Sequence, residues 1–193
     1  MNAPLSRCAD PDPRDGLNSV YSSPGSSLDP NHAADDMRLT AEVRAVVAGA
    51  RRRSIRDGDR LVDTAHLLHS LLELDPAARE ACDAGTGQVA RVLGYLVQRS
   101  IGYGLRWSGS VEDSGTLPVI AGPVSGWSPA AAVAVSRAVS LAQRRGRPQA
   151  DGLDLLDALV ADPDCRAVEV LHIAGLDVGV NVSGYRDDGP VAS

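Results

Sequence analysis

The sequence contains no Phe and no Lys, and only 3% of its residues are aromatic. Any core must therefore be aliphatic, because Ala, Val and Leu supply nearly all of the apolar volume. With 44% hydrophobic residues over 193 positions, the chain is long enough to build one such core. The sustained alternation of apolar and polar residues that is typical of strands is missing, and small aliphatic residues favour helices. The composition predicts an all-α fold.

The chain is acidic, with a formal net charge of −6, and all 19 of its cationic residues are Arg. Because nucleic-acid binding draws most of its affinity from cations that neutralise phosphates, this charge argues against a general nucleic-acid-binding protein. One basic cluster is concentrated, and we name it the Arg51–Arg60 cluster: Arg51, Arg52, Arg53, Arg56 and Arg60. A solvated helix end is its ordinary interpretation, since cations are favourable near a helix C-terminus. Contact with an acidic partner or nucleic acid is the alternative.

Cysteines and apolar runs are also scarce. Cys8, Cys82 and Cys165 are odd in number and form no CxxC pair, which predicts free thiols in a reducing compartment. No stretch approaches the roughly 18 consecutive apolar residues that a membrane-spanning helix requires, and the first residues do not resemble a secretory signal. We therefore expect a cytoplasmic protein with no membrane partner.

Stretches rich in turn-forming and polar residues divide the chain. Residues 1–36 are predicted to be a disordered tail, because they hold too few apolar residues to offset the entropy of ordering them, and residues 182–193 are predicted to be a polar C-terminal tail. Residues 102–126 are predicted to be a linker, because turn formers alternate there with scattered apolar residues. The linker separates a helical segment over residues 37–101 from a second one over residues 127–181.

Both segments follow the same helical plan. Thr40 and Ser128 each stand before a helical apolar pattern, and their hydroxyls can cap the free amides of the first turn. Leu-rich helices are predicted after Asp63 and after Asp151. The most regular amphipathic pattern in the chain runs over residues 89–101 and predicts a further helix.

A shift of 88 positions superposes the second segment on the first, with Ser128 falling on Thr40. The other equivalent pairs are Val47 and Val135, Ala50 and Ala138, Gly58 and Gly146, Asp63 and Asp151, Leu67 and Leu155, Leu68 and Leu156, and Leu71 and Leu159. The cap, the glycine that ends the first helix and the Leu pair all recur at equivalent positions. We therefore interpret residues 37–181 as a tandem repeat. We expect two four-helix units, packed around a pseudo-twofold axis, with a groove near their paired first helices.

The repeated strings resemble the Clp N-terminal repeat domain, which heads ClpC- and ClpA-type AAA+ unfoldases. The first repeat contains LTAEVRAVVAGARRR, DTAHLLHSLLELDP and ARVLGYLV, and the second contains WSPAAAVAVSRAVSLAQRRG, DGLDLLDALVADP and VEVLHIAGLDV. The resemblance covers about residues 37–180. It implies an all-helical double repeat that holds substrates, adaptor proteins and, in the ClpC branch, cyclic-peptide antibiotics.

The resemblance also implies a peptide-binding or protein-binding groove at the two first helices. Its residues here are Leu39, Thr40, Val43, Trp127, Ser128 and Ala132. Trp127 keeps an aromatic residue that lines the family's antibiotic groove, whereas Leu39 stands at its counterpart in the first repeat. The acidic residues with which ClpC-type domains bind phosphorylated arginine are replaced by Ala65 and Leu153, so we expect no binding of that group.

The sequence contains no G-x-x-x-x-G-K-[ST] phosphate loop, which excludes ATP-driven unfolding by this chain. We predict a non-enzymatic, stand-alone binding protein that needs no cofactor. Its predicted partners are a Clp unfoldase, its adaptors or its client proteins, and cyclic peptides, and it would act as an accessory or competitor in Clp-dependent proteolysis. The alternative is a transcriptional or nucleic-acid-associated regulator that uses the Arg51–Arg60 cluster.

One pair of residues raises the question of a metal. His66 and His69 lie three residues apart on a predicted helix, a spacing that can bring two imidazoles to one ion. Asp154 and Asp157 occupy the equivalent positions of the second repeat, and no Cys lies nearby. We therefore favour a structural role, in which His66 caps a helix or forms hydrogen bonds within the fold, and predict no metal site.

Overall fold

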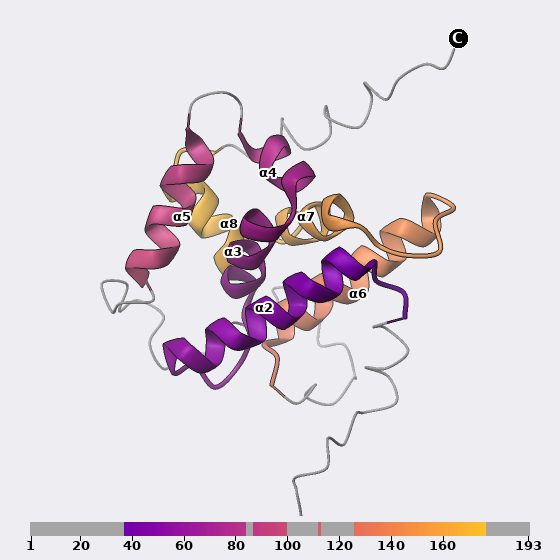
Figure 1. Cartoon of the computed structure of the whole chain (residues 1–193), viewed down its shortest axis with the longest axis horizontal. Helices are drawn as coiled ribbons and strands as arrows, with labels where there is room; N and C mark the ends of the chain where they lie inside the picture. Colours follow the sequence, from indigo (N-terminus) through magenta and orange to yellow (C-terminus); the bar gives the residue numbers. More distant parts are fainter. Residues whose placement is uncertain (1–36, 84–86, 100–111, 113–125, 177–193) are drawn as a thin grey trace, which may run out of the picture.

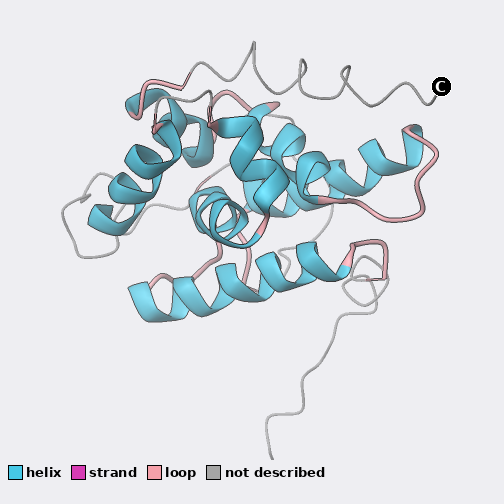
Figure 2. Cartoon of the chain, turned by 45° about the horizontal axis from the view of Figure 1, so that its top comes forward, coloured by secondary structure: helices cyan, strands magenta, loops and turns pink. Residues whose placement is uncertain are grey.

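The computed structural model describes residues 37–83, 87–99, 112 and 126–176. Within these ranges the chain forms seven helices and no strand beyond two isolated bridges, so the predicted all-α fold is confirmed (Figure 2). The predicted tails lie outside the described residues, as does the predicted linker apart from Glu112 and Gly126.

The helices are α2 (Ala41–Asp57), α3 (Thr64–Leu74), α4 (Pro76–Cys82), α5 (Gln88–Gln98), α6 (Pro129–Arg144), α7 (Gly152–Val160) and α8 (Arg166–Ile173). Helix α3 lies at the centre and contacts every other described helix (Figure 1). No helix in the described ranges combines the length and the hydrophobicity needed to cross a lipid bilayer.

The helices begin where the sequence places their caps. Thr40 Oγ1 accepts a hydrogen bond from Val43 N at 3.3 Å, and Ser128 Oγ accepts one from Ala131 N at 3.1 Å. Asp63 and Asp151 cap α3 and α7, and in each case the backbone N–H of the cap donates a reciprocal bond to the side chain of the third residue of the helix. These contacts satisfy amides that a helix start leaves without an intrahelical partner.

The core is aliphatic, as predicted. The Leu residues that repeat in α3 and α7 are completely buried: Leu67, Leu68, Leu71, Leu155, Leu156 and Leu159. Val43 and Val46 of α2 and Ala138 of α6 cover them from the first helix of each segment. Large-to-small changes at such positions typically cost about 2–5 kcal/mol, so these side chains hold the segments together.

Two short backbone contacts cross between the segments. Leu39 forms a parallel bridge with Ala150, and Val62 forms one with Trp127. In each case the residue before the cap of a first helix pairs with the residue before the cap of the other segment's Leu-rich helix. The hydrogen bonds are Thr40 N to Ala150 O (3.0 Å), Ala150 N to Arg38 O (2.8 Å), Ser128 N to Val62 O (2.8 Å) and Val62 N to Gly126 O (2.8 Å).

The first segment contains the four predicted helices, α2 to α5, and the described part of the second contains three, α6 to α8. Under the shift of 88 positions, the start of α5 at Gln88 corresponds to Leu176, the last described residue. The predicted fourth helix of the second segment therefore lies outside the described residues. Gly87 before α5 and its equivalent Gly175 both adopt a left-handed backbone, with φ of 67° and 78°.

Candidate functional site

Most of the side chains predicted to line a groove are buried. Leu39 and Val43 are 1% and 0% exposed, and Trp127 is 6% exposed. All three belong to the hydrophobic core, and the Ser128 hydroxyl is buried in its capping interaction. Thr40 and Ala132 are half-buried. The structure thus brings the predicted residues to the two cross-segment bridges, where only the half-buried ones leave appreciable side-chain surface for a ligand.

Trp127 also connects the core to the Arg51–Arg60 cluster. The guanidinium carbon of Arg51 lies 5.4 Å from the centroid of the Trp127 ring, a cation–π geometry. Arg51 is an exposed residue of α2, so it covers the ring from the solvent side.

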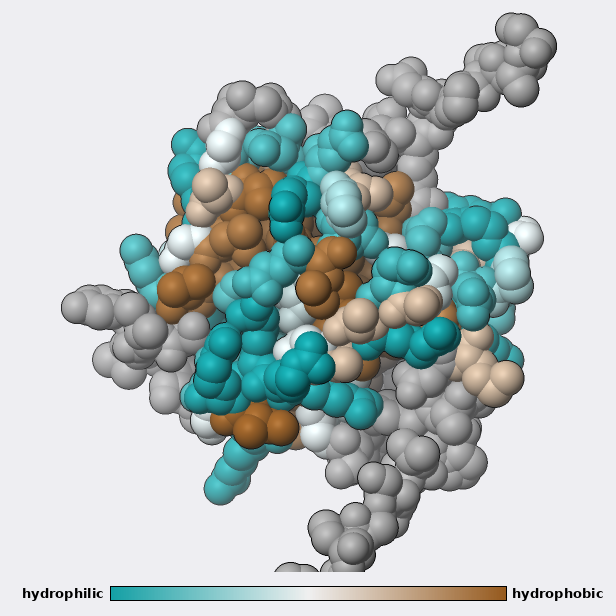
Figure 3. All heavy atoms as spheres, in the orientation of Figure 1, coloured by the Kyte–Doolittle hydropathy of each residue, from teal (hydrophilic) through white to brown (hydrophobic). Residues whose placement is uncertain are grey.

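The Arg51–Arg60 cluster is partly neutralised. Arg53 forms an ion pair with Glu73 and donates to Ser70 Oγ at 3.3 Å. Arg51, Arg52 and Arg56 are exposed, and Ile55, between them, is 79% exposed. Figure 3 shows hydrophilic residues over the C-terminal half of α2 with a hydrophobic patch beside them.

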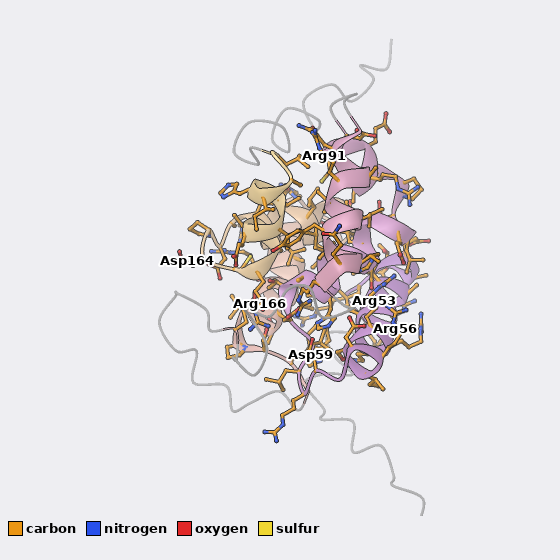
Figure 4. All side chains as sticks on the ribbon, turned by 90° about the vertical axis from the view of Figure 1, so that its left-hand side faces the viewer. Arg53, Arg56, Asp59, Arg91, Asp164 and Arg166 are labelled. Carbon is orange, nitrogen blue, oxygen red and sulfur yellow. The ribbon has the colours of Figure 1, made fainter. Side chains whose placement is uncertain are left out.

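A partly buried polar network surrounds the start of α3, and we name it the Asp63 cluster: Asp59, Asp63, His66, Arg99 and Arg166. Asp63 Oδ2 accepts hydrogen bonds from Arg99 Nη2 at 2.6 Å and Arg166 Nη1 at 2.7 Å. Asp63 N donates to His66 Nδ1 at 3.2 Å, so the predicted capping role of His66 is confirmed. Figure 4 shows Arg166 of α8 on the side of the molecule that carries Asp59.

The Asp63 carboxylate is ionised within this network. Burial alone would raise its pKa, but hydrogen bonding from His66 and the guanidiniums of Arg99 and Arg166 hold the pKa well below the ordinary Asp value. A buried carboxylate is tolerated when opposite charges and hydrogen bonds compensate for its lost hydration. Asp63 therefore acts as the shared counter-ion of two guanidiniums from α8 and the end of α5.

Three members of the cluster have the composition of a metal site. Ligand atoms of Asp59, Asp63 and His66 lie within 4.8 Å of one another, and Nε2 of His66 is buried without a hydrogen bond. However, Arg99 Nη2 lies 3.3 Å from Asp59 Oδ2 and 2.6 Å from Asp63 Oδ2, between the two carboxylates. A metal ion there would be repelled by this guanidinium, so the residues fit an ion-pair network better than a metal site.

In the equivalent region of the second segment, Arg replaces the acidic residues and Asp replaces the histidines. The pairs, each 88 positions apart, are Asp57 and Arg145, Asp59 and Arg147, His66 and Asp154, and His69 and Asp157. Arg147 Nη2 donates to Asp154 Oδ1 at 2.6 Å, and Arg145 Nη2 donates to Asp157 Oδ2 at 2.8 Å. Acid facing imidazole in the first segment is thus replaced by Arg facing acid in the second.

Sequence reasoning missed Glu112, which is 6% exposed. Its Oε2 accepts from Thr64 N and Ser128 Oγ, both at 2.9 Å, and its Oε1 accepts from Arg166 N at 2.7 Å and from the Thr64 hydroxyl. Glu112 falls in the predicted linker and is followed by another acid, Asp113, so no local pattern distinguishes it. Its donors are 16 to 54 positions away, beyond the reach of a local pattern.

The chain matches no known protein-family profile and no curated protein. Among 22 matching chains of solved structures is one described as "Preliminary structural investigations of a malarial protein secretion system". It is 13% identical, with a TM-score of 0.54, and the match covers 78% of this chain and 93% of that one. At this identity the likeness shows a shared fold alone.

Proposed function

We propose that residues 37–181 form a Clp N-like double repeat that binds polypeptides or peptide-like ligands without enzymatic activity. It would act as an accessory, adaptor-like or competing factor in Clp-dependent proteolysis. The proposal is supported by the strings quoted above, by the all-helical fold, and by the recurrence of caps and left-handed glycines at equivalent positions.

The two cross-segment bridges are the observation that carries this proposal. Adding 88 to 39 gives 127, and subtracting 88 from 150 gives 62, so the bridge of Leu39 with Ala150 maps onto the bridge of Trp127 with Val62. Reciprocal exchange of equivalent contacts is what a twofold relation between two copies produces. The four hydrogen bonds of the bridges obey the same rule.

The ligand would contact the surface beside these bridges. Leu39, Val43 and Trp127 form its buried floor, and Thr40 and Ala132 supply half-buried edges. An apolar floor with polar rims suits a peptide that presents aliphatic or aromatic side chains, including a cyclic-peptide antibiotic.

Calorimetry with such a cyclic peptide tests the binding. Trp127→Ala is a poor probe because it also opens a cavity in the core. Ala132→Asp adds a charge at a half-buried position of α6, and Ala45→Asp makes the same change at an exposed position of α2. We expect binding to be lost in the first variant and kept in the second. Absence of heat with the wild-type protein would contradict peptide binding.

A pull-down tests the role in proteolysis. The wild-type chain should recover a Clp unfoldase, its adaptors or its clients from cytoplasm, and Ala132→Asp should recover less of them than Ala45→Asp. Recovery of none of these proteins by the wild type would contradict the accessory role, even if a cyclic peptide binds.

The exposure of Arg51, Arg52 and Arg56 on one helix supports a second candidate, a nucleic-acid-associated regulator. Binding to duplex DNA that weakens steeply with salt, and that Arg52→Ala reduces, would favour it. DNA binding that is absent at low salt would eliminate this candidate.

A further inference from the structure

The C-terminal half of α2 exposes three cations around one aliphatic side chain. We name this surface the α2 basic face: Arg51, Arg52, Ile55 and Arg56, all exposed, with Ile55 79% exposed. Arg51 and Ile55 are four positions apart, as are Arg52 and Arg56, so they form two neighbouring rows on one side of the helix. An aliphatic side chain within the face favours a polypeptide as its ligand, because a phosphate has no apolar group to place against it.

The cations of this face have little acidic partnership within the described ranges. Arg52 forms neither an ion pair nor a hydrogen bond with any described residue. Arg51 lies over the Trp127 ring at 5.4 Å, and Arg56 has its neighbour Asp57 at 3.4 Å. Because a guanidinium presents several donors in a geometry that matches a carboxylate, the face is suited to bind acidic side chains.

The complementary charge is concentrated in one segment of the same chain. Residues 37–176 contain 16 Arg and 16 Asp or Glu, so their formal charges cancel. Residues 1–36 contain six Asp and two Arg, which gives −4 of the total charge of −6. Three of these acids stand close together in the sequence, at Asp10, Asp12 and Asp15.

This acidic stretch is connected to α2 by a chain of suitable length. Asp15 and Met37 are 22 positions apart, and a coil of that length has an r.m.s. end-to-end distance of roughly 25 Å. Helix α2 has 17 residues and is therefore about 25 Å long, with Met37 four positions before its start and the basic face near its end. The effective concentration of a tethered ligand is highest when the span of the tether matches the distance to the site.

The spacing of the acids also matches the spacing of the cations. Asp10 and Asp12 each precede a proline, and proline favours an extended backbone in the residue before it. Alternate residues of an extended chain lie on the same face, about 6–7 Å apart. Arg52 and Arg56, one helical turn apart, have a similar separation of about 5–6 Å.

We propose that the α2 basic face is a docking surface for residues 10–15 of this chain, with the carboxylates of Asp10 and Asp12 paired to Arg52 and Arg56. An acidic peptide or a nucleic acid from outside would then reach this face only in competition with the chain's own acidic stretch. This proposal goes beyond the function proposed above and does not depend on it.

A nitroxide attached to Cys8, two positions before Asp10, tests the docking in the full chain. Cys82 and Cys165 are buried, and burial raises the pKa of both thiols to about 11, so a thiol reagent should couple at Cys8. Cys8→Ser should accordingly take up no label. In nuclear magnetic resonance spectra we expect the nitroxide to broaden the amide signals of residues 51–56. The broadening should be lost near 1 M salt, where the Debye length is about 3 Å.

Two matched variants of the folded part show whether the basic face is responsible. Arg52→Ala removes a cation of the face, and Arg91→Ala removes an exposed cation of α5, which Figure 4 shows far from Arg56. We expect weaker broadening of residues 51–56 in Arg52→Ala and wild-type broadening in Arg91→Ala. Equal broadening in the two variants would overturn the assignment of the face.

The acidic side of the pairing is tested outside the folded part. Asp10→Asn combined with Asp12→Asn removes two charges and should abolish the broadening of residues 51–56. Asp29→Asn removes an acid from the same segment outside the stretch of residues 10–15 and should preserve it. Full broadening without the charges of Asp10 and Asp12 would overturn the proposed pairing.

A mixed sample distinguishes docking within one chain from docking between chains. Chains that carry the nitroxide are mixed with isotope-labelled chains that lack it, so only contacts between chains broaden the observed signals. Docking within one chain predicts no broadening in this sample. Broadening equal to that of the singly labelled protein would identify a second copy as the occupant and overturn the proposal. Absence of broadening at low salt in the nitroxide-bearing chain itself would overturn the docking surface.

Discussion

Asp63 and Arg166 are 103 positions apart in the sequence, yet Arg166 Nη1 lies 2.7 Å from Asp63 Oδ2 inside the protein. Arg99 shares the same carboxylate oxygen. One acidic side chain at the start of α3 thus joins the start of α8 and the end of α5. Because the backbone amide of Arg166 also binds Glu112, the start of α8 is attached to two buried carboxylates.

Asp63→Asn should lower the free energy of unfolding by about 3–5 kcal/mol, the usual cost of removing one partner from a buried ion pair. Asn keeps the cap, since its side-chain oxygen can still accept from His66 N. The loss in free energy of unfolding therefore measures the contribution of the negative charge. Urea denaturation at pH 7 measures it. Asp164→Asn in an exposed turn is the control, and we expect a change within about 0.5 kcal/mol. Similar losses in both variants would contradict this account.

The local features of the fold were predictable from the sequence, and the long-range ones were not. Thr40, Asp63 and Ser128 cap helices as predicted, because a cap depends on residues three positions away. The ion pairs of Arg99 and Arg166 depend on how the helices pack, which no spacing encodes. The same limit applies to the predicted groove residues. The sequence places them at the starts of the first helices, but it does not show that most of them are buried.

His69 should make the protein less stable in mild acid. Burial lowers its pKa to about 4, and charge from Arg53 and Arg56 adds to this shift, while Glu73 and Asp57 oppose it. The unfolded chain has a His pKa near 6.5, so between about pH 6.5 and pH 4 the unfolded state binds more protons and stability falls as pH is lowered. Urea midpoints measured across this window test the prediction.

The comparison variants for this pH dependence are two His→Gln changes. His69→Gln cannot take up the proton, so its midpoint should vary less with pH over the same window. His172→Gln alters an exposed residue and should retain the wild-type slope. An unchanged slope in His69→Gln would show that another group is responsible.

Two glycines should respond to Ala in opposite directions. A Cβ at Gly152, the first residue of α7, would overlap the carboxylate of Asp75, which caps α4 by accepting from Ala78 N at 2.9 Å. Displacing this cap should cost about 1–2 kcal/mol. Gly94→Ala on the exposed side of α5 meets nothing within 4 Å and should stabilise the helix by about 0.5–1 kcal/mol. Thermal unfolding measures both, and equal signs would contradict the packing of Asp75 on α7.

The exchange of charged residues between the segments can be tested by introducing the first segment's residues at the equivalent positions of the second. Asp154→His introduces the residue that the first segment has at this position and can keep the helix cap, since His66 forms the same reciprocal bond.

Two guanidiniums would then face an imidazole at a site where Asp154 is completely buried, and we expect a loss of about 3 kcal/mol. Adding Arg145→Asp and Arg147→Asp restores the pattern of the first segment and should recover at least half of that loss. Without Asp154→His, the two Arg→Asp changes should destabilise the protein more than the three changes together. A double-mutant cycle on urea midpoints measures this coupling. If the losses in free energy of unfolding are additive, position 154 and the two Arg positions act independently. That result would contradict an exchange of charged residues that is coupled between these positions.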